Sequence, residues 1–158
     1  PGTHSKWAWV QDRSIARFHT FPTGELYDLL LNESLIGSIF TPNSWDQATF
    51  SEAIKLGYEN SRILSNLFLT RSRVLLEQMD SYSVSAWLSG LLIGSEIREG
   101  SELTDGLTTK IFLIGAIDLC EKYGSALQQL EIEYHQVSPE VTINALVSIA
   151  RQMASLGE

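Results

Sequence analysis

The first seven residues of the chain combine groups that could bind an oxyanion. Pro1-Gly2-Thr3-His4-Ser5-Lys6-Trp7 brings a helix-breaking proline, a flexible glycine, two hydroxyls and a cation together before an alternating stretch typical of a strand. Backbone N–H groups at such a turn can converge on phosphate oxygens, and the side chains can add hydroxyl donors and a positive charge. Composition alone favours a plainer interpretation, which is a surface turn that opens a β-hairpin.

Four titratable side chains are candidates for a chemical role. His4 could donate to a phosphate or a substrate, or it could be a turn residue bonded to the backbone. Glu25 could accept a bond from a substrate hydroxyl, or it could act on the helix dipole from a first helical turn. His19 and His135 have no Cys, Asp or second His at ligand spacing, so we expect no metal at either one.

Composition and charge exclude several classes of function. The net charge is −8 and the Lys and Arg residues are not clustered, which argues against a nucleic-acid surface. The longest apolar runs, such as Leu29-Leu30-Leu31, are too short to cross a membrane, and no secretory signal is recognisable. Cys120 is the single cysteine and is expected to be a small core residue. These features predict a soluble, ordered, cytoplasmic protein.

Periodicity predicts the elements that must position the first loop. Residues 6–11 and 14–20 alternate around Asp12-Arg13, which predicts a β-hairpin. The period then changes to that of helices. We expect one capped by Thr23 and reaching Leu31, one capped by Ser44 over 45–59, a short one near 63–69, and one over 83–99 that Gly100 ends.

The last third of the chain has a βαβα pattern. Residues 110–114 form a continuous apolar run, which predicts a strand buried on both faces and ended by Gly115. A helix follows, then a strand over 131–137, then a terminal helix with Pro139 at its first position. A strand that turns at a glycine into a helix is a common nucleotide contact, although most such turns bind nothing.

Two features of the 83–99 segment need an explanation. Gly90 and Gly94 lie one helical turn apart although each costs about 1 kcal/mol relative to alanine. We therefore expect a close neighbour there, and a packed helix or sheet is favoured over a ligand. The acidic residues at and beyond the end of this segment are predicted to form an exposed stretch; they are Glu96, Glu99, Glu102 and Asp105.

Several blocks of residues, taken in order, resemble the C-terminal half of the 2-dehydro-3-deoxygalactonokinase family. Two departures from the family pattern are Ala116-Ile117, where a small residue and a proline are usual, and Pro22, where an apolar residue is usual. The matching blocks are 1–7, Phe21-Pro22-Thr23-Gly24-Glu25-Leu26, Leu67-Phe68 with Arg71 and Leu75-Leu76, 88–96, and Ile114-Gly115 with Tyr123 and Ala126-Leu127.

The resemblance implies an α/β fold, an actin-like (ribonuclease-H-like) ATPase lobe. Its mixed sheet would have a β-hairpin, a helical insertion over about 24–100 and a βαβα end. Residues 1–158 would then be the single C-terminal lobe of a two-lobe sugar-acid kinase. The N-terminal lobe is absent from this chain, which looks truncated because a strand is expected before Pro1.

The resemblance also implies a reaction and its site. The γ-phosphoryl group of ATP would pass to the terminal hydroxyl of 2-dehydro-3-deoxy-D-galactonate to give the 6-phosphate. Mg²⁺ would be positioned by an Asp of the absent lobe, and no catalytic or metal residue is assigned here. The implied contacts are Gly2, Thr3, His4, Ser5 and Lys6 for phosphate, Thr23, Gly24 and Glu25 for substrate, and Gly115 and Ala116 for the nucleotide.

Two alternatives to an enzyme half stay open. One is a non-catalytic actin-like binding or regulatory module, and the other is a degraded gene product without activity. The partners expected of the kinase are ATP, the sugar acid and the absent lobe, with no nucleic acid and no membrane. A homo-oligomer and the epimer of the sugar acid are left open, because no linear motif reports the orientation of a single hydroxyl.

Overall fold

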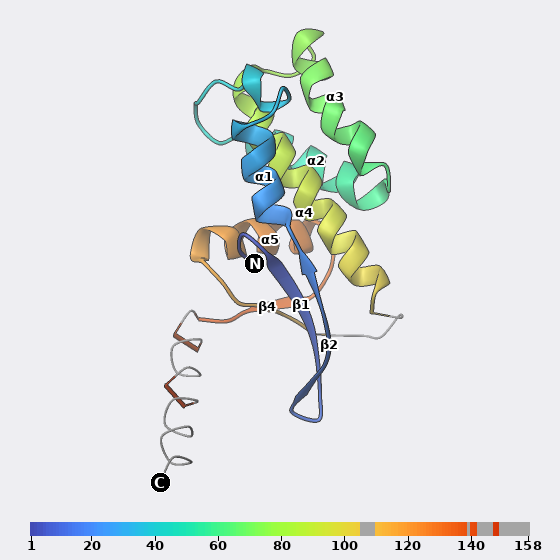
Figure 1. Ribbon diagram of the computed structural model, residues 1–158, viewed down its shortest axis with the longest axis vertical. Coiled ribbons are helices and arrows are strands. Elements are labelled where there is room, and N and C mark those ends of the chain that lie inside the picture. The colour runs from blue at the N-terminus through green and yellow to red at the C-terminus, as the bar shows by residue number, and fades with distance from the viewer. Residues whose placement is uncertain (105–109, 139, 142–146, 149–158) are drawn as a thin grey trace.

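A group of helices stands above two small sheets in the computed structural model, which describes residues 1–104, 110–138, 140–141 and 147–148 (Figure 1). The predicted α/β class with a hairpin and a βαβ end is confirmed. The elements are β1 (Ser5–Gln11), β2 (Ser14–Phe21), α1 (Thr23–Asn32), η1 (Gly37–Ile39), α2 (Gln47–Glu59), α3 (Ile63–Leu75), η2 (Ser81–Ser83), α4 (Val84–Glu102), β3 (Ile111–Leu113), α5 (Ile117–Gln129) and β4 (Tyr134–Gln136).

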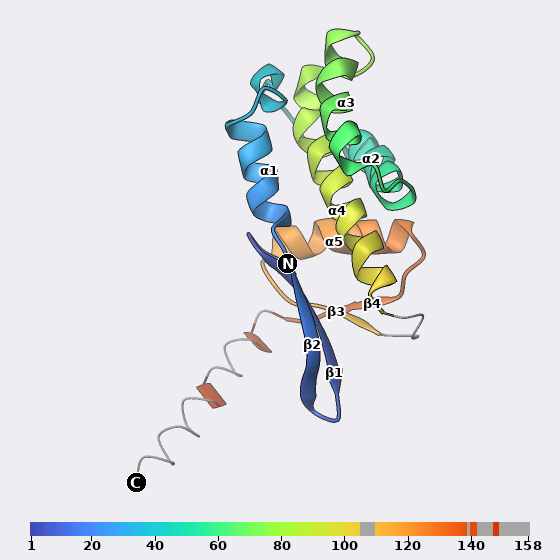
Figure 2. The ribbon, with the colours of Figure 1, turned by 45° about the vertical axis from the view of Figure 1, so that its right-hand side comes forward.

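The hairpin forms where the alternation predicts it. Strands β1 and β2 pair antiparallel from Ser5 opposite Phe21 to the turn, with an irregularity in register after Trp9. Asp12 and Arg13 take φ values of 49° and 65°, and two positive φ angles in a two-residue turn match the twist of the flanking strands. The hairpin projects away from the helices (Figure 2).

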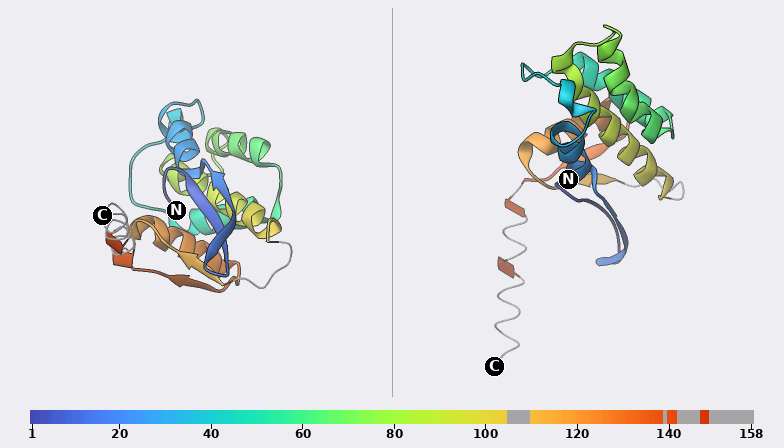
Figure 3. Two further views of the ribbon diagram at one scale, coloured as in Figure 1. Left: turned by 60° about the horizontal axis from the view of Figure 1, so that its bottom comes forward. Right: turned by 45° about the horizontal axis from the view of Figure 1, so that its top comes forward.

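The strands do not form one mixed sheet within the described residues. Strands β3 and β4 make a separate parallel pair, with Ile111 opposite Tyr134, and α5 runs alongside them (Figure 3). The prediction that the 110–114 strand is buried on both faces is wrong in this structure, because Leu113 is buried while Phe112 is 58% and Ile114 46% exposed. The terminal helix lies largely outside the described residues.

Glycines let α2 and α4 pack with their backbones in close contact. A Cβ on Gly90 would lie 2.5 Å from the carbonyl oxygen of Phe50, one on Gly94 would collide with that of Ile54, and one on Gly57 with that of Leu91. The expectation that a helix or sheet, rather than a ligand, packs at Gly90 and Gly94 is confirmed, and the neighbour is helix α2.

Gly100 does not end α4, contrary to prediction. The helix continues to Glu102, and the indole ring of Trp7 occupies the space in which a Cβ of Gly100 would lie, at 2.6 Å. A helical glycine here permits β1 to approach α4. Beneath this contact α4 is buried over most of its length, and its apolar residues share the core with Cys120, which is 1% exposed as predicted.

The N-termini of α1 and α2 differ from the predicted caps. Helix α1 begins directly after Pro22, and the hydroxyl of Thr23 donates to the carboxylate of Glu96 instead of capping the helix. Helix α2 is capped by Asp46 rather than Ser44, because the Asp46 carboxylate accepts from the backbone N–H of Thr49 at 3.0 Å. Within the described residues, no helix combines the length and apolarity needed to cross a membrane.

The Asp46 cap makes folding stability depend on pH. Its carboxylate also accepts from the hydroxyls of Ser83 and Thr49, each at 2.6 Å, and these bonds, Ser83 first, lower the pKa of Asp46 from its usual 3.8. Because the folded pKa lies below the unfolded one, this stabilisation is present above about pH 4 and is lost as the pH falls through the folded pKa.

We therefore expect Asp46→Asn to keep the cap but to lose part of the acid dependence. Asn caps helices about as well as Asp and does not titrate. The difference in unfolding free energy between wild type and variant, from urea titrations at a series of pH values, should shrink as the pH falls below about 4. Asp12→Asn, in the exposed hairpin turn, is the matched control. A difference that is constant with pH would contradict the assignment.

Candidate functional site

Three segments that are far apart in the sequence meet at the start of the chain. A Cβ on Gly24 would lie 2.6 Å from the carbonyl oxygen of Gly2, and the backbone N–H of Glu25 donates to the carbonyl of Thr3 at 3.0 Å. On the other side, a Cβ on Gly115 would lie 2.6 Å from the carbonyl oxygen of Pro1. The first loop thus lies between the start of α1 and the turn that precedes α5.

The exposed polar groups of this junction face solvent from the loop and from α1. His4 Nε2 and a carboxylate oxygen of Glu25 are 2.8 Å apart, and about half of each side chain is exposed. Lys6 is exposed and its Nζ lies 3.5 Å from the carbonyl oxygen of His4, while Thr3 is exposed as well. His4 thus bonds to a side chain, which neither sequence interpretation anticipated.

Two of the predicted site hydroxyls point inward. Ser5 is 3% and Thr23 9% exposed, and both donate to the carboxylate of Glu96, Ser5 Oγ at 2.7 Å to Oε1 and Thr23 Oγ1 to Oε2. Their side chains are therefore engaged with the protein interior, and the exposed donors of the loop are Thr3, His4 and Lys6.

Glu96 is the residue that sequence reasoning missed. It was expected in an exposed acidic stretch, but it is 3% exposed; Glu99 is exposed as predicted, and Glu102 pairs with Arg98 at 2.9 Å. Asp105 lies outside the described residues. The signal was available, because position 96 falls one turn after Leu92 on the apolar stripe of α4, where a carboxylate needs partners.

The partners of Glu96 come from three other elements. Besides Ser5 and Thr23, the indole Nε1 of Trp7 donates to Oε1 at 2.8 Å and the hydroxyl of Tyr123 donates to Oε2 at 2.5 Å. Burial and then the negative charge of Glu96 raise the pKa of Tyr123 far above its usual value, so its hydroxyl stays protonated. Each carboxylate oxygen therefore receives two donors, and the buried charge is compensated.

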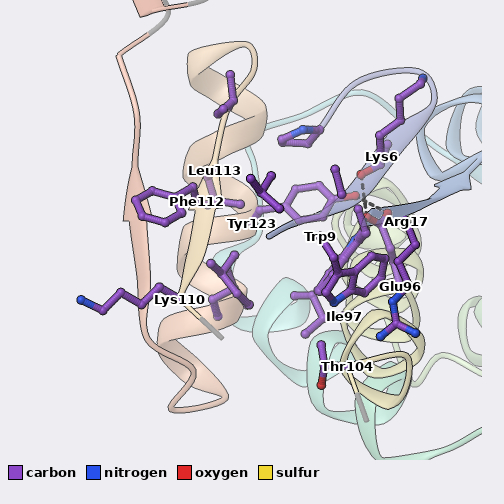
Figure 4. Close-up of a pocket in the computed structure, with 18 of the residues that line it drawn as sticks. Lys6, Trp9, Arg17, Glu96, Ile97, Thr104, Lys110, Phe112, Leu113 and Tyr123 are labelled. Atoms are coloured by element: carbon purple, nitrogen blue, oxygen red, sulfur yellow. Dashed lines mark hydrogen bonds between the residues drawn. The ribbon is translucent and has the colours of Figure 1, made fainter. Parts of the chain in front are cut away.

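A cavity of about 800 Å³ separates β1 from β3 (Figure 4). Its walls include the buried side chains of Ile97, Leu113 and Leu127, and Glu96 and Tyr123 lie at its inner side. The ends of the Lys6 and Lys110 side chains point away from the other labelled residues (Figure 4). Among the described residues, β1 pairs only with β2 and β3 only with β4, so the cavity is flanked by two strand edges.

The acidic and histidine side chains of the described residues do not converge as a metal centre would require. No group of three or more His, Cys, Asp or Glu residues that could hold a metal is present in that part of the chain. His19 and His135 pack instead against aromatic rings, those of Trp9 and Phe112.

Comparisons with known proteins agree on one family. The family model described as 2-keto-3-deoxy-galactonokinase matches residues 1–149. The chain is 34% identical over 158 residues to "2-dehydro-3-deoxygalactonokinase" of Escherichia coli (strain K12), covering 98% of this chain and 53% of that protein. It is 32% identical over 157 residues to "Probable 2-dehydro-3-deoxygalactonokinase DgoK1" of Rhizobium meliloti (strain 1021), covering 95% of this chain and 50% of that protein.

A solved structure agrees with these relatives. The crystal structure of a candidate 2-dehydro-3-deoxygalactonokinase from Sinorhizobium meliloti superposes with a TM-score of 0.88 at 28% identity, over 98% of this chain and 52% of that one. The chain therefore spans about half the length of the curated relatives that it matches.

Proposed function

Because this chain belongs to the 2-keto-3-deoxy-galactonokinase family, we propose that it forms one wall of the cleft of an ATP-dependent sugar-acid kinase. The substrate is 2-dehydro-3-deoxy-D-galactonate, phosphorylated on its terminal hydroxyl to the 6-phosphate. The observation that supports this most directly is the meeting of the first loop with the start of α1 and with the turn at Gly115. A phosphoryl donor and an acceptor need such adjacent subsites.

The first loop has the groups that ATP phosphates would need. A Cβ on Gly2 would have no atom within 4 Å, so the space beside this backbone is open to a ligand. Thr3 and Lys6 are exposed and offer a hydroxyl donor and a positive charge. When bound, ATP supplies the phosphoryl group. Lys6 and the backbone N–H groups of Gly2, Thr3, His4 and Ser5 hold its phosphates, and the backbone at Gly115 and Ala116 lies against the nucleotide.

The start of α1 supports a sugar-acid subsite. The Glu25 carboxylate is half exposed and has lone pairs left after its bond with His4, so it can accept a substrate hydroxyl. His4 fixes the orientation of this carboxylate. Gly24 keeps the helix start close to the loop, and Thr23 anchors it from beneath through Glu96.

The rest of the cleft belongs, in this proposal, to the half of the kinase that this chain does not cover. The Mg²⁺ of the reaction is assigned to side chains of that half; the described residues contain no group of three or more His, Cys, Asp or Glu residues that could hold a metal ion. The cavity between β1 and β3 is mainly apolar and is bounded by strand edges. It therefore suits a strand contributed by the other half of the kinase better than a polar sugar. Residues 1–158 then form a C-terminal lobe with the helical insertion over 24–100.

The assay that tests the proposal uses a kinase of full family length containing this chain. ATP-dependent phosphorylation of 2-dehydro-3-deoxy-D-galactonate and of its epimer is followed by ADP release. Turnover faster with the galactonate derivative supports the proposal. Nucleotide binding without turnover would favour the non-catalytic module instead, and neither binding nor turnover would favour the degraded gene product.

Lys6→Ala is expected to lower kcat/KM by about tenfold or more, because a charge-assisted contact contributes roughly 1.5–3 kcal/mol. Its melting temperature should stay near that of wild type, since Lys6 is exposed. Lys55→Ala removes an exposed cation of α2 and is the matched control. Steady-state kinetics with wild-type turnover in Lys6→Ala would remove Lys6 from the phosphate site.

A further inference from the structure

We propose that Glu96 is a positioning residue that locks the phosphate loop to the sugar-acid subsite, so that the two segments take their binding geometry together. The inference rests on the proposed function of these segments. Glu96 itself is buried and touches neither subsite surface, so it would act through Ser5 and Thr23.

Three of the four donors to Glu96 belong to the two segments that carry the proposed subsites. Ser5 and Trp7 belong to β1, which continues the first loop, whereas Thr23 opens α1 directly before Gly24 and Glu25. Both segments donate to one carboxylate, at sequence separations of 91 and 73 residues from Glu96. A single side chain of α4 therefore fixes the two subsites relative to each other.

A second tie joins the same segments on the solvent side. There His4 bonds to Glu25 at 2.8 Å, and the backbone N–H of Glu25 donates to the carbonyl of Thr3 at 3.0 Å. The side chains of His4 and Glu25 are about half exposed, so water weakens the bond between them, whereas the donors to Glu96 act on a buried charge. We therefore expect the buried tie to dominate the relative position of the two segments.

Glu96→Gln removes the charge that holds the two segments while it keeps the size and shape of the side chain. The indole of Trp7 can only donate, so the glutamine oxygen must face Ser5 and Trp7 and its NH₂ group must face Thr23 and Tyr123, whose hydroxyls can turn to accept. The shape of the core is kept, but the charged tie between the two subsites is lost. Glu99→Gln, an exposed carboxylate on the same helix, is the matched control.

The kinetic readout uses the full-length kinase. Misplacement of subsites by about 1 Å can cost about 100-fold, so we expect kcat/KM of Glu96→Gln to fall by about tenfold to 100-fold, with KM raised for both ATP and the sugar acid. Tyr123→Phe removes a donor that belongs to neither segment, and it should lower the melting temperature while leaving both KM values unchanged. Unchanged KM values in folded Glu96→Gln would overturn the proposal.

Hydrogen exchange supplies a readout that does not depend on activity. Peptides over residues 1–9 and 21–30 should both exchange faster in Glu96→Gln and remain at the wild-type rate in Glu99→Gln. Faster exchange throughout the core with no excess in these two peptides would show a merely structural role and overturn the proposal. If Glu96→Gln does not fold, Thr23→Val breaks the α1 tie alone. Its 21–30 peptide should then exchange faster, and an unchanged rate would overturn the proposal.

The two hypotheses fail in different ways. A wild-type kinase that phosphorylates no sugar acid removes the proposed function, while coupled exchange of the two peptides would still establish the positioning by Glu96. Wild-type turnover combined with unaltered exchange and kinetics in Glu96→Gln removes the positioning and leaves the function in place.

Discussion

The 158-residue chain alone is expected to phosphorylate no sugar acid, and addition of the other half of the kinase is expected to restore ATP-dependent phosphorylation. The chain covers 53% of the relative from Escherichia coli. In the proposed function it supplies phosphate and sugar-acid contacts, and its described residues contain no group of three or more side chains that could hold a metal ion. Transfer requires both substrates to be held in one closed geometry, which contributes several kcal/mol of the rate acceleration, up to about 11 kcal/mol. In the proposed function this chain supplies only one wall of the cleft, which cannot hold both substrates in that geometry.

The same chain is expected to self-associate when alone. Strands β1 and β3 present edges to the cavity between them, next to exposed apolar residues such as Val10, Phe112 and Ile114. Such edges invite pairing with another chain. Size-exclusion chromatography with light scattering should show oligomers that the other half converts to a one-to-one complex.

The control for restoration is a mixture that contains Lys6→Ala, which should recover at most about a tenth of the wild-type activity. The proposal would not survive a monodisperse monomer that phosphorylates the substrate unaided. That result would contradict both the assignment of the cavity to a strand of the other half and the division of the cleft between two walls.

Gly90→Ala and Gly94→Ala are expected to destabilise the fold although alanine is the better helix former. Alanine gains about 1 kcal/mol of helix propensity at each site. Against this, the added Cβ meets backbone atoms of α2, and backbone cannot move aside as the end of a flexible side chain can. Overpacking of this kind costs about 1–3 kcal/mol and more where rigid elements must separate.

We expect the overpacking to exceed the gain in propensity, with a net loss of about 2 kcal/mol and a fall in melting temperature of roughly 4–8 °C for each variant. Gly2→Ala is the control, because its Cβ would have no atom within 4 Å and the melting temperature should not change. Calorimetry that finds Gly90→Ala as stable as wild type would show that the two helices are not in backbone contact.

The sequence by itself determined the local elements and the family. The hairpin, the βαβ end and the close approach of another element at Gly90 and Gly94 follow from short-range periodicity and from glycine placement, which act between neighbouring residues. The resemblance, confirmed by the family model over residues 1–149, drew attention to the first loop, and the structure then placed that loop beside residues 23–25 and Gly115.

Only the tertiary structure decided which polar groups face inward. Ser5 and Thr23 have the same residue types as exposed donors, and Glu96 stands among acidic residues of which Glu99 is exposed; what separates them is contact across 73 to 91 residues. The same holds for Gly100, which looked like a helix end until Trp7 was found to pack on it. Periodicity reports which face of an element is apolar, whereas the partner of a buried polar atom depends on which elements that face meets.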